Sequence, residues 1–192
     1  MEKERISNKT EILLIGGSAG SLDALLQILP QIKKEIPFAI VIILHRKSGA
    51  ESLLSDLLQL RSPIPVREIE DKDKIQPAVI YLAPGDYHVL VEKEKYFSLD
   101  VSEKINFSRP SIDVSFETAA EVYGANTTGL LLSGANADGT EGLKRIKEAG
   151  GKALIQQPSS AEVSYMPQQA LREIEADAVL ATEDIAAYIN SL

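Results

Sequence analysis

Cysteine is absent from the 192-residue chain, and histidine occurs only twice, at His45 and His88. Without cysteine there is no disulfide framework, no thiolate zinc site and no cysteine nucleophile. Any reaction that needs an imidazole base must use one of the two histidines. The lack of disulfides fits a reducing compartment, and we expect a cytoplasmic protein with no bound metal and no cofactor.

Long apolar runs and an excess of positive charge are also missing. No apolar run approaches the roughly 18–20 residues of a membrane span, so we expect no membrane insertion. Residues 1–10 are polar and charged, which is unlike a secretory signal. The net charge of −8 argues against general nucleic-acid binding, because neutralising phosphates requires clustered lysine and arginine.

The chain has the composition of an ordinary globular domain, with 44% hydrophobic and 25% charged residues. Its length suits one domain with a substantial core. Residues 1–9 are polar, and we expect them to be a disordered lead-in. Because no linker or repeat divides the remainder, residues 10–192 are predicted to form a single domain.

Short apolar runs alternate with amphipathic segments along the chain. The apolar runs predict strands, and the run from Phe38 to Leu44 is typical of a strand buried on both faces. Strands are expected at 12–15, 38–44, 78–83, 128–132, 152–156 and 178–181. Helices are expected at 21–32, 52–60, 111–123, 140–149, 166–174 and from 182 onward, with caps at Ser21, Ser111 and Thr182 to Asp184.

This alternation predicts a three-layer, doubly wound α/β fold, in which helices cover both faces of a mostly parallel sheet. Residues 89–91 and 96–101 flank a charged turn at 92–95 and are predicted to form a hairpin. We expect this hairpin to supply an antiparallel edge to the sheet. Ligands of such folds bind at the carboxyl ends of the strands, so the residues that follow each apolar run are the candidates for function.

Residues 16–20 follow the first predicted strand and open the first helix, with the sequence Gly-Gly-Ser-Ala-Gly. The segment matches G-x-S-x-G in the strand–turn–helix setting that this motif requires. A tight turn would project the Ser18 hydroxyl outward, and the N–H groups at the start of the helix could stabilise an oxyanion. The same turn could instead hold Ser18 as a helix cap or bind a phosphate.

Two other strand ends carry reactive side chains. His45 follows the strand at 38–44, and Asp138 lies in the small-residue segment after the strand at 128–132. Asp138 could orient a histidine and stabilise its cation. Taken alone, His45 could merely cap the sheet edge, and Asp138 could cap the helix that starts at Thr140.

Together the three residues are more informative than any one of them. A serine nucleophile needs a base, and the base needs an orienting acid. Ser18, His45 and Asp138 each follow a predicted parallel strand, so they are candidates for a catalytic triad. Their chain order, Ser–His–Asp, differs from the Ser–Asp–His order of α/β-hydrolases.

Several motifs in a fixed order resemble the catalytic domain of the chemotaxis protein-glutamate methylesterases, the CheB family. The resemblance runs from about residue 11 to residue 190 and so covers nearly the whole chain. The matching stretches are Ile15–Ser21, which resembles I-G-A-S-x-G-G, then His45, Tyr81–Gly85 with His88, Arg109–Val114, Ser133–Gly142, and Val163–Pro167 followed by Ala170.

The resemblance implies a parallel sheet with flanking helices, and a triad of Ser18, His45 and Asp138. It implies hydrolysis of glutamate methyl esters on the cytoplasmic domains of chemoreceptors, with release of methanol. Some members also deamidate receptor glutamines. The receiver domain that is usual in the family has no counterpart in these 192 residues. A separate receiver domain or another chemotaxis signalling protein is therefore a candidate partner.

The chain departs from the family pattern beside the candidate triad. Ala19 stands where threonine is usual, and Ala135 and Asn136 replace the methionine and glycine of T-G-M-G-x-D-G. Arg46 and Lys47 replace the Met-Pro that commonly follows the histidine. Backbone N–H groups at 19 and 135 would still be able to form an oxyanion hole.

Other residues in or beside the matching stretches have expected supporting roles. His88 is expected to line the site or to act structurally, and Met166 is expected to contact substrate. Arg46, Lys47 and Arg109 could form a basic rim that steers acidic receptor helices, or they could simply be solvated charges.

Two rival functions stay open at this point. A phosphate-binding module could use the turn at 16–21, although it lacks the lysine of a P-loop and the full G-x-G-x-x-G spacing. The other rival is a receptor-binding module of the same fold that has lost turnover. The departures at 19, 46–47 and 135–136 are the support for this second rival.

Overall fold

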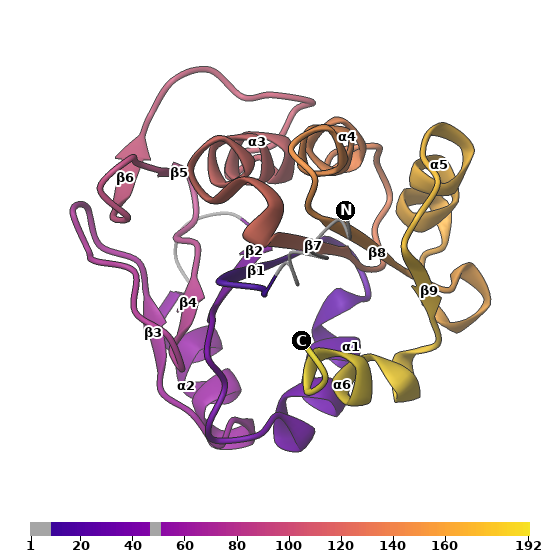
Figure 1. The fold of residues 1–192 in the computed structure, drawn as a ribbon, viewed down its shortest axis with the longest axis horizontal. Coiled ribbons are helices and arrows are strands. Elements are labelled where there is room, and N and C mark those ends of the chain that lie inside the picture. The colour runs from indigo at the N-terminus through magenta and orange to yellow at the C-terminus, as the bar shows by residue number, and fades with distance from the viewer. Residues whose placement is uncertain (1–8, 47–50) are drawn as a thin grey trace, which may run out of the picture.

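The structure is a computed structural model, and it describes residues 9–46 and 51–192. In that part of the chain, seven parallel strands form one sheet in the order β3-β4-β2-β1-β7-β8-β9 (Figure 1). The strands are β1 (Ile12–Gly17), β2 (Ala39–Leu44), β3 (Val66–Glu68), β4 (Ile80–Leu82), β7 (Thr127–Leu131), β8 (Lys152–Gln156) and β9 (Ala178–Leu180). The expected lead-in at residues 1–9, Lys9 excepted, and Lys47 lie outside the described residues.

The helices pack in two layers, one on each face of the sheet (Figure 1). One layer holds α1 (Ser21–Ile28), α2 (Glu51–Arg61) and α6 (Thr182–Ile189), and the other holds α3 (Ile112–Tyr123), α4 (Thr140–Glu148) and α5 (Tyr165–Glu173). Short 3-10 helices lie at η1 (Leu29–Gln31), η2 (Gly124–Asn126) and η3 (Pro158–Ser160). The predicted doubly wound α/β fold is therefore confirmed.

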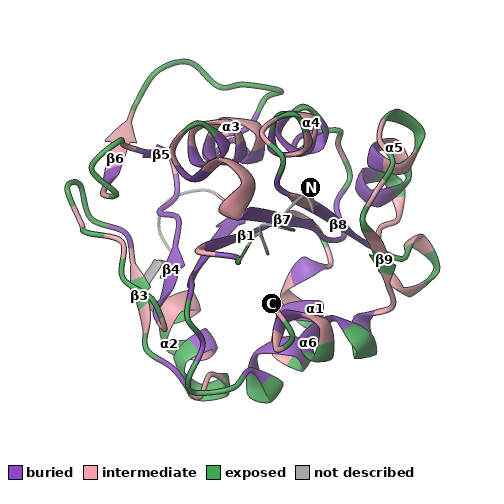
Figure 2. Ribbon diagram, viewed as in Figure 1, coloured by how far each residue is buried: buried purple, intermediate pink, exposed green. Residues whose placement is uncertain are grey.

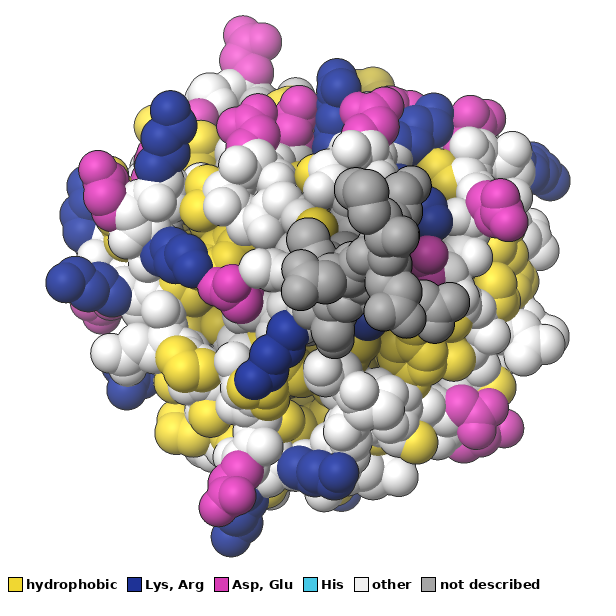
Figure 3. Space-filling model, viewed as in Figure 1, with side chains coloured by type: hydrophobic (Ala, Val, Ile, Leu, Met, Phe, Trp, Pro, Cys, Tyr) yellow, Lys and Arg dark blue, Asp and Glu magenta, His cyan; other side chains and the backbone are white. Residues whose placement is uncertain are grey.

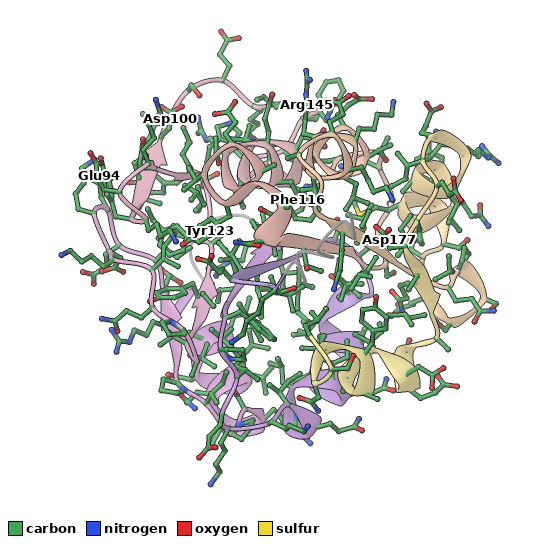
Figure 4. The ribbon with its side chains drawn as sticks, viewed as in Figure 1. Glu94, Asp100, Phe116, Tyr123, Arg145 and Asp177 are labelled. Carbon is green, nitrogen blue, oxygen red and sulfur yellow. The ribbon has the colours of Figure 1, made fainter. Side chains whose placement is uncertain are left out.

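Alternate residues of the central strands pack into two apolar clusters, one on each face of the sheet. Ile12 and Leu14 of β1 point into the cluster beneath α3, α4 and α5, whereas Leu13 and Ile15 point into the cluster on the opposite face. All four side chains are fully buried, and Figure 2 shows the same burial along the sheet. Phe116 lies on the side of α3 that faces the sheet (Figure 4).

The chain changes direction at β1, and this change fixes where a ligand can bind. From β1 the chain runs outward through β2 and β4 on one side, then returns to place β7 on the other side of β1. The crevice between β1 and β7, at their carboxyl ends, is thus the switch point at which doubly wound folds bind ligands. Residues that follow β1, β2 and β7 meet there.

The predicted hairpin exists, but it is not an edge of the large sheet. Strands β5 (His88–Val91) and β6 (Phe97–Asp100) form a separate two-stranded antiparallel sheet beside α3. The Ser115 hydroxyl of α3 donates to the Val89 carbonyl at 2.8 Å, and Val91 N–H donates to the Thr118 hydroxyl at 3.0 Å. One edge of the large sheet is instead β3, a three-residue strand with partly exposed side chains that the sequence did not predict.

The caps of the helices agree with the predictions only in part. Ser111 caps α3, as predicted, by accepting a hydrogen bond from Val114 N–H. The cap of α1 is not Ser21 but Gly20, whose φ of 79° is left-handed. Ser21 is the first helical residue, and its hydroxyl donates back to the Ser18 carbonyl. The cap of α6 is Ala181, one residue before the predicted Thr182.

Charged side chains are mixed over the face of the molecule that Figure 3 shows. Lysine and arginine side chains lie among aspartate and glutamate there, rather than gathering in one field. Across the described ranges, no helix combines the length and the apolar character that crossing a membrane requires.

Candidate active site

The first residues after three neighbouring strands lie side by side. Parallel pairing of β1 with β2 places Gly17 opposite Leu44, so the next residues, Ser18 and His45, leave neighbouring strands at the same edge of the sheet. His45 N–H donates to the Gly17 carbonyl at 3.2 Å. On the other side, Ser18 N–H donates to the carbonyl of Ser133, which follows β7, at 2.9 Å. The strand register thus brings these residues together at the switch point.

Ser18 lies on the turn between β1 and α1, with Gly17 and Gly20 near it in the chain and Gly134 packed against it. The left-handed Gly20 ends the turn and lets α1 begin at once. A Cβ on Gly134 would lie 3.1 Å from the Ser18 Cβ, so a bare backbone is what allows the second loop to approach the serine. Ser18 is partly exposed, and its hydroxyl makes no hydrogen bond to any other described residue.

His45 and Asp138 are joined directly. His45 Nε2 and Asp138 Oδ2 are 2.7 Å apart, with 11% of the histidine side chain exposed and none of the aspartate. The Asp138 carboxylate also accepts hydrogen bonds from Ile112 N–H at 2.7 Å, Asp113 N–H at 3.0 Å and the Ser111 hydroxyl at 3.1 Å. The predicted meeting of His45 and Asp138 is therefore confirmed.

Those backbone donors show that Asp138 caps a helix other than the one considered from the sequence. The cap of α4 is Gly139, with no side-chain hydrogen bond, whereas Asp138 binds the free N–H groups at the start of α3. Burial alone would raise the pKa of the Asp138 carboxyl. The hydrogen bonds from His45 and from the start of α3 outweigh burial and hold that pKa below its usual value. The group is thus a carboxylate at neutral pH.

A carboxylate partner fixes the tautomer of His45. Because the carboxylate can only accept, His45 Nε2 carries the proton and Nδ1 has the free lone pair. Nδ1 faces two donors at 3.4 Å, the Ser108 hydroxyl and Asn136 Nδ2. Asn136 Oδ1 in turn accepts from Asp138 N–H at 3.1 Å. The nitrogen available for proton transfer is therefore Nδ1.

Two exposed alanines lie on the loops that carry or contact Ser18. Ala19 follows Ser18 directly, and Ala135 follows Gly134, which packs against the serine. Neither alanine N–H donates a hydrogen bond to another residue in the described part of the chain. Unpaired backbone donors on the two loops that meet at Ser18 are candidates for an oxyanion hole. The small side chains at 19 and 135 leave both donors open.

The two described arginines of the expected rim are already engaged. Arg46 is mostly buried, and its Nη2 donates to Glu68 Oε2 at 3.0 Å and to the Ala83 carbonyl at 2.9 Å. Arg109 Nη1 donates to the carbonyls of Val101 and Ser102, each at 2.8 Å. Both guanidinium groups therefore hold loops around the site. Lys47 lies outside the described residues.

His88 and Met166 stand behind the site rather than on it. His88 is 1% exposed; its Nε2 donates to the Glu103 carbonyl at 2.9 Å and its Nδ1 accepts from Ser111 N–H at 3.1 Å. Met166 has no exposed surface and packs beneath Gly134, where an added Cβ would come within 2.5 Å of the Met166 Cε. Both side chains support the loops that carry the reactive groups. Because both are buried, neither offers an exposed surface to a substrate.

The sequence reasoning did not single out Ser108 or Asp113. Asp113 Oδ1 accepts from Gly139 N–H at 2.8 Å and from Gly142 N–H at 2.7 Å, at the start of α4. Burial and the charge of Asp138 raise the pKa of Asp113 to about 7. An acidic residue in the first turn of a helix is ordinary, so no local pattern indicates that Asp113 contacts a second helix.

A cavity of about 320 Å³ opens beside His45. Its walls include His45, Arg46, Lys104, Phe107, Ser108 and Arg109. Within the described ranges, no three histidine, aspartate or glutamate side chains are grouped so as to hold a metal ion. The arrangement offers an alcohol, an oriented imidazole and two N–H donors, which are the groups needed for acyl transfer.

Comparison with known proteins gives the same picture. The sequence model of the CheB methylesterase family matches residues 13–189. A Leptospira interrogans protein, provisionally named a protein-glutamate methylesterase/protein-glutamine glutaminase, is 44% identical over 176 residues, which cover 92% of this chain and 91% of that protein. The Thermotoga maritima protein-glutamate methylesterase/protein-glutamine glutaminase is 35% identical over 181 residues, 93% of this chain and 52% of that protein.

A solved structure matches the fold as well. The crystal structure of the Thermotoga maritima CheB methylesterase catalytic domain superposes with a TM-score of 0.92 at 33% identity. The match covers 95% of this chain and 98% of that chain. The sheet order and the two helical layers described above are therefore those of that domain.

Proposed function

The chain belongs to the CheB methylesterase family, and from that premise we propose that it hydrolyses glutamate methyl esters on chemoreceptors to glutamate and methanol. The observation that carries the proposal is the 2.7 Å bond between His45 Nε2 and Asp138, formed beside Ser18 at the switch point of the sheet. Because Asp138 binds Nε2, His45 Nδ1 is the nitrogen that can act as a base. Ser18, whose hydroxyl makes no hydrogen bond to another described residue, lies on the turn directly after the neighbouring strand β1.

The first half of the reaction forms an acyl-enzyme. Ser18 Oγ attacks the ester carbonyl carbon while His45 Nδ1 takes the hydroxyl proton. Asp138 stabilises the imidazolium that results, and the N–H groups of Ala19 and Ala135 hold the oxyanion. The C–O bond to the methoxy group then breaks, and His45 returns the proton to the departing methoxide, which leaves as methanol.

The second half regenerates the enzyme. His45 Nδ1 takes a proton from a water molecule, and the hydroxide attacks the acyl carbon. The Ser18 ester bond breaks, the proton returns to Ser18, and the substrate keeps a glutamate carboxylate. A glutamine side chain can follow the same route with ammonia as leaving group. The names of the relatives include protein-glutamine glutaminase, and this activity corresponds to the second reaction.

The proposed substrates are the methylated cytoplasmic domains of chemoreceptors, so we place the reaction in the cytoplasm. The Thermotoga maritima relative is about twice as long as the stretch it shares with this chain. We propose that a receiver domain or another chemotaxis signalling protein regulates the site.

The test compares two serine variants with the unchanged protein on a methylated receptor fragment, with methanol release as the measurement. Ser18→Ala should lower kcat by about 10⁴–10⁶, the range for removal of a triad member. Ser108→Ala removes the serine that lies 3.4 Å from His45 Nδ1 and should retain far more activity. An organophosphonate should label Ser18, which mass spectrometry of peptides can locate.

Three results would reject the mechanism or replace it. Near-normal methanol release by Ser18→Ala excludes Ser18 as nucleophile, and label on Ser108 assigns the nucleophile there. Binding of the receptor fragment with no methanol release by the unchanged protein would instead favour the rival receptor-binding module.

A further inference from the structure

A strained turn carries an aromatic side chain to the mouth of the cavity. Ile105 and Ser108 exchange two backbone hydrogen bonds, of 3.1 Å and 2.9 Å, around a two-residue loop. The loop residues, Asn106 and Phe107, have φ values of 49° and 62°. Both are left-handed, as in type I′ turns, which favour Asn-Gly. Asparagine suits its position, but a phenylalanine at positive φ is an outlier.

Phe107 is also the most exposed large apolar side chain among the described residues, at 97%. Its ring makes no contribution to the core, and its backbone conformation costs stability. A glycine would serve the turn better, so folding does not explain this residue. Phe107 does, however, line the cavity beside His45, together with Lys104.

The turn is held firmly with respect to the reactive groups. His88 Nε2 fixes the Glu103 carbonyl at 2.9 Å, and Asn106 Nδ2 donates to Asp113 Oδ2 at 3.2 Å. Arg109 binds the carbonyls of Val101 and Ser102, and the Ser108 hydroxyl reaches His45 Nδ1. These bonds hold the backbone of the turn in place on the wall of the cavity, and a preformed backbone loses little entropy on binding.

We propose that Phe107 is a specificity-determining residue that packs against an apolar side chain of the polypeptide carrying the ester. The inference rests on the proposed function and adds how the protein substrate is held. Val101 and Ile105, on the same segment of the chain, are also exposed apolar residues, at 65% and 40%. Because Phe107 itself lines the cavity that His45 also lines, the ring lies where a polypeptide bound at that cavity can contact it.

The experiment compares two substrates, a methylated receptor fragment and a small N-acyl glutamate γ-methyl ester that lacks the apolar side chains of the receptor polypeptide. For Phe107→Ala we expect KM for the receptor fragment to rise about 10-fold, the cost of a contact worth about 1.4 kcal/mol. The kcat for the fragment and the constants for the small ester should change less than about 2-fold. Phe107→Tyr should restore the KM.

Leu60→Ala is the matched control, because Leu60 is 83% exposed and lies on α2. It should leave the constants for both substrates as they are. Phe107→Gly separates binding from folding: it relieves the left-handed strain, so its Tm should equal or exceed that of the unchanged protein while KM for the fragment still rises.

Several outcomes would overturn the inference, and each differs from failure of the proposed function. Equal losses on both substrates would show that the ring shapes the reactive site, and no loss on either would show that it touches no substrate. Self-association that Phe107→Ala abolishes, with KM unchanged, would assign the ring to contacts between copies. Absence of hydrolysis of both esters by the unchanged protein would reject the proposed function itself.

Discussion

Asp113 and Asp138 each cap the helix that begins beside the other. The Asp138 carboxylate accepts the N–H groups of Ile112 and Asp113 at the start of α3. The Asp113 carboxylate accepts the N–H groups of Gly139 and Gly142 at the start of α4. The exchange locks the two helices together, and it also holds two acids close to each other in a largely buried place.

The pKa of about 7 at Asp113 predicts a pH-dependent stability. Its ordinary value is 3.8, so between about pH 4 and pH 7 the unfolded chain has lost this proton while the folded chain retains it. Stability therefore falls as pH rises through this window. Relative to Asp113→Asn, the unchanged protein should lose stability between pH 4.5 and pH 8, by at most on the order of 4 kcal/mol at about 1.4 kcal/mol per pKa unit.

Chemical denaturation at several pH values measures this difference. The asparagine oxygen can still accept from Gly139 and Gly142, so the variant keeps the cap of α4 and loses the titration. The carboxyl of Asp138 titrates below this window because its pKa is lowered, and it does not disturb the comparison. Parallel curves for the two proteins from pH 4.5 to pH 8 would contradict the prediction.

The ion pair of Arg46 with Glu68 should contribute to stability. The pair is 3.0 Å long, and 12% of the arginine and 28% of the glutamate side chain are exposed. A double-mutant cycle with Arg46→Ala and Glu68→Ala should give a coupling energy of about 1 kcal/mol from denaturation curves. Because the Arg46 guanidinium is already paired with Glu68, we expect substitutions of Arg46 to lower stability as well as any rate of substrate capture.

An exposed pair on α4 is the control for this cycle. Lys144 and Glu141 are 2.7 Å apart, but 68% of the glutamate side chain is exposed. Exposed pairs of this kind contribute about 0.3–0.5 kcal/mol. Equal coupling energies in the two cycles would show that partial burial does not strengthen the Arg46 pair.

The Ala135 N–H should matter more to catalysis than the Ala135 side chain. Ala135→Pro removes the donor, and we expect kcat for methyl-ester hydrolysis to fall by about 10²–10³, the effect of losing one oxyanion donor. Ala135→Ser keeps the donor and should retain activity near that of the unchanged protein. A proline variant that unfolds at the usual temperature yet retains its kcat would remove Ala135 from the oxyanion hole.

The positions of the candidate reactive residues were largely readable from the sequence. His45 and Asp138 follow buried strands, and parallel strands of one sheet end at one edge, so both were candidates for one site. The approach of the Ser18 hydroxyl to His45 stays a prediction. The strand register supports it, since Ser18 and His45 are the first residues beyond the pair Gly17 and Leu44.

Contacts between loops that are distant in the chain could not be predicted from the sequence. Nothing local indicates that Asp138 caps α3 rather than α4, because a capping residue looks the same whichever helix it serves. Arg46 looked like a rim charge because its partner, Glu68, lies on β3, a strand too short to show a hydrophobic period. The hairpin was predicted, but its separation from the large sheet depends on its packing against α3.

Three of the four hydrogen bonds to the Asp138 carboxylate come from the cap and first turn of α3. The Asp138 carboxylate is therefore held by α3, although Asp138 itself belongs to the loop that follows β7. Farther along, Ser115 and Thr118 fasten the same helix to the β5–β6 hairpin. Since α3 is bonded both to the hairpin and to Asp138, we expect a tilt of the hairpin to move the carboxylate that binds His45.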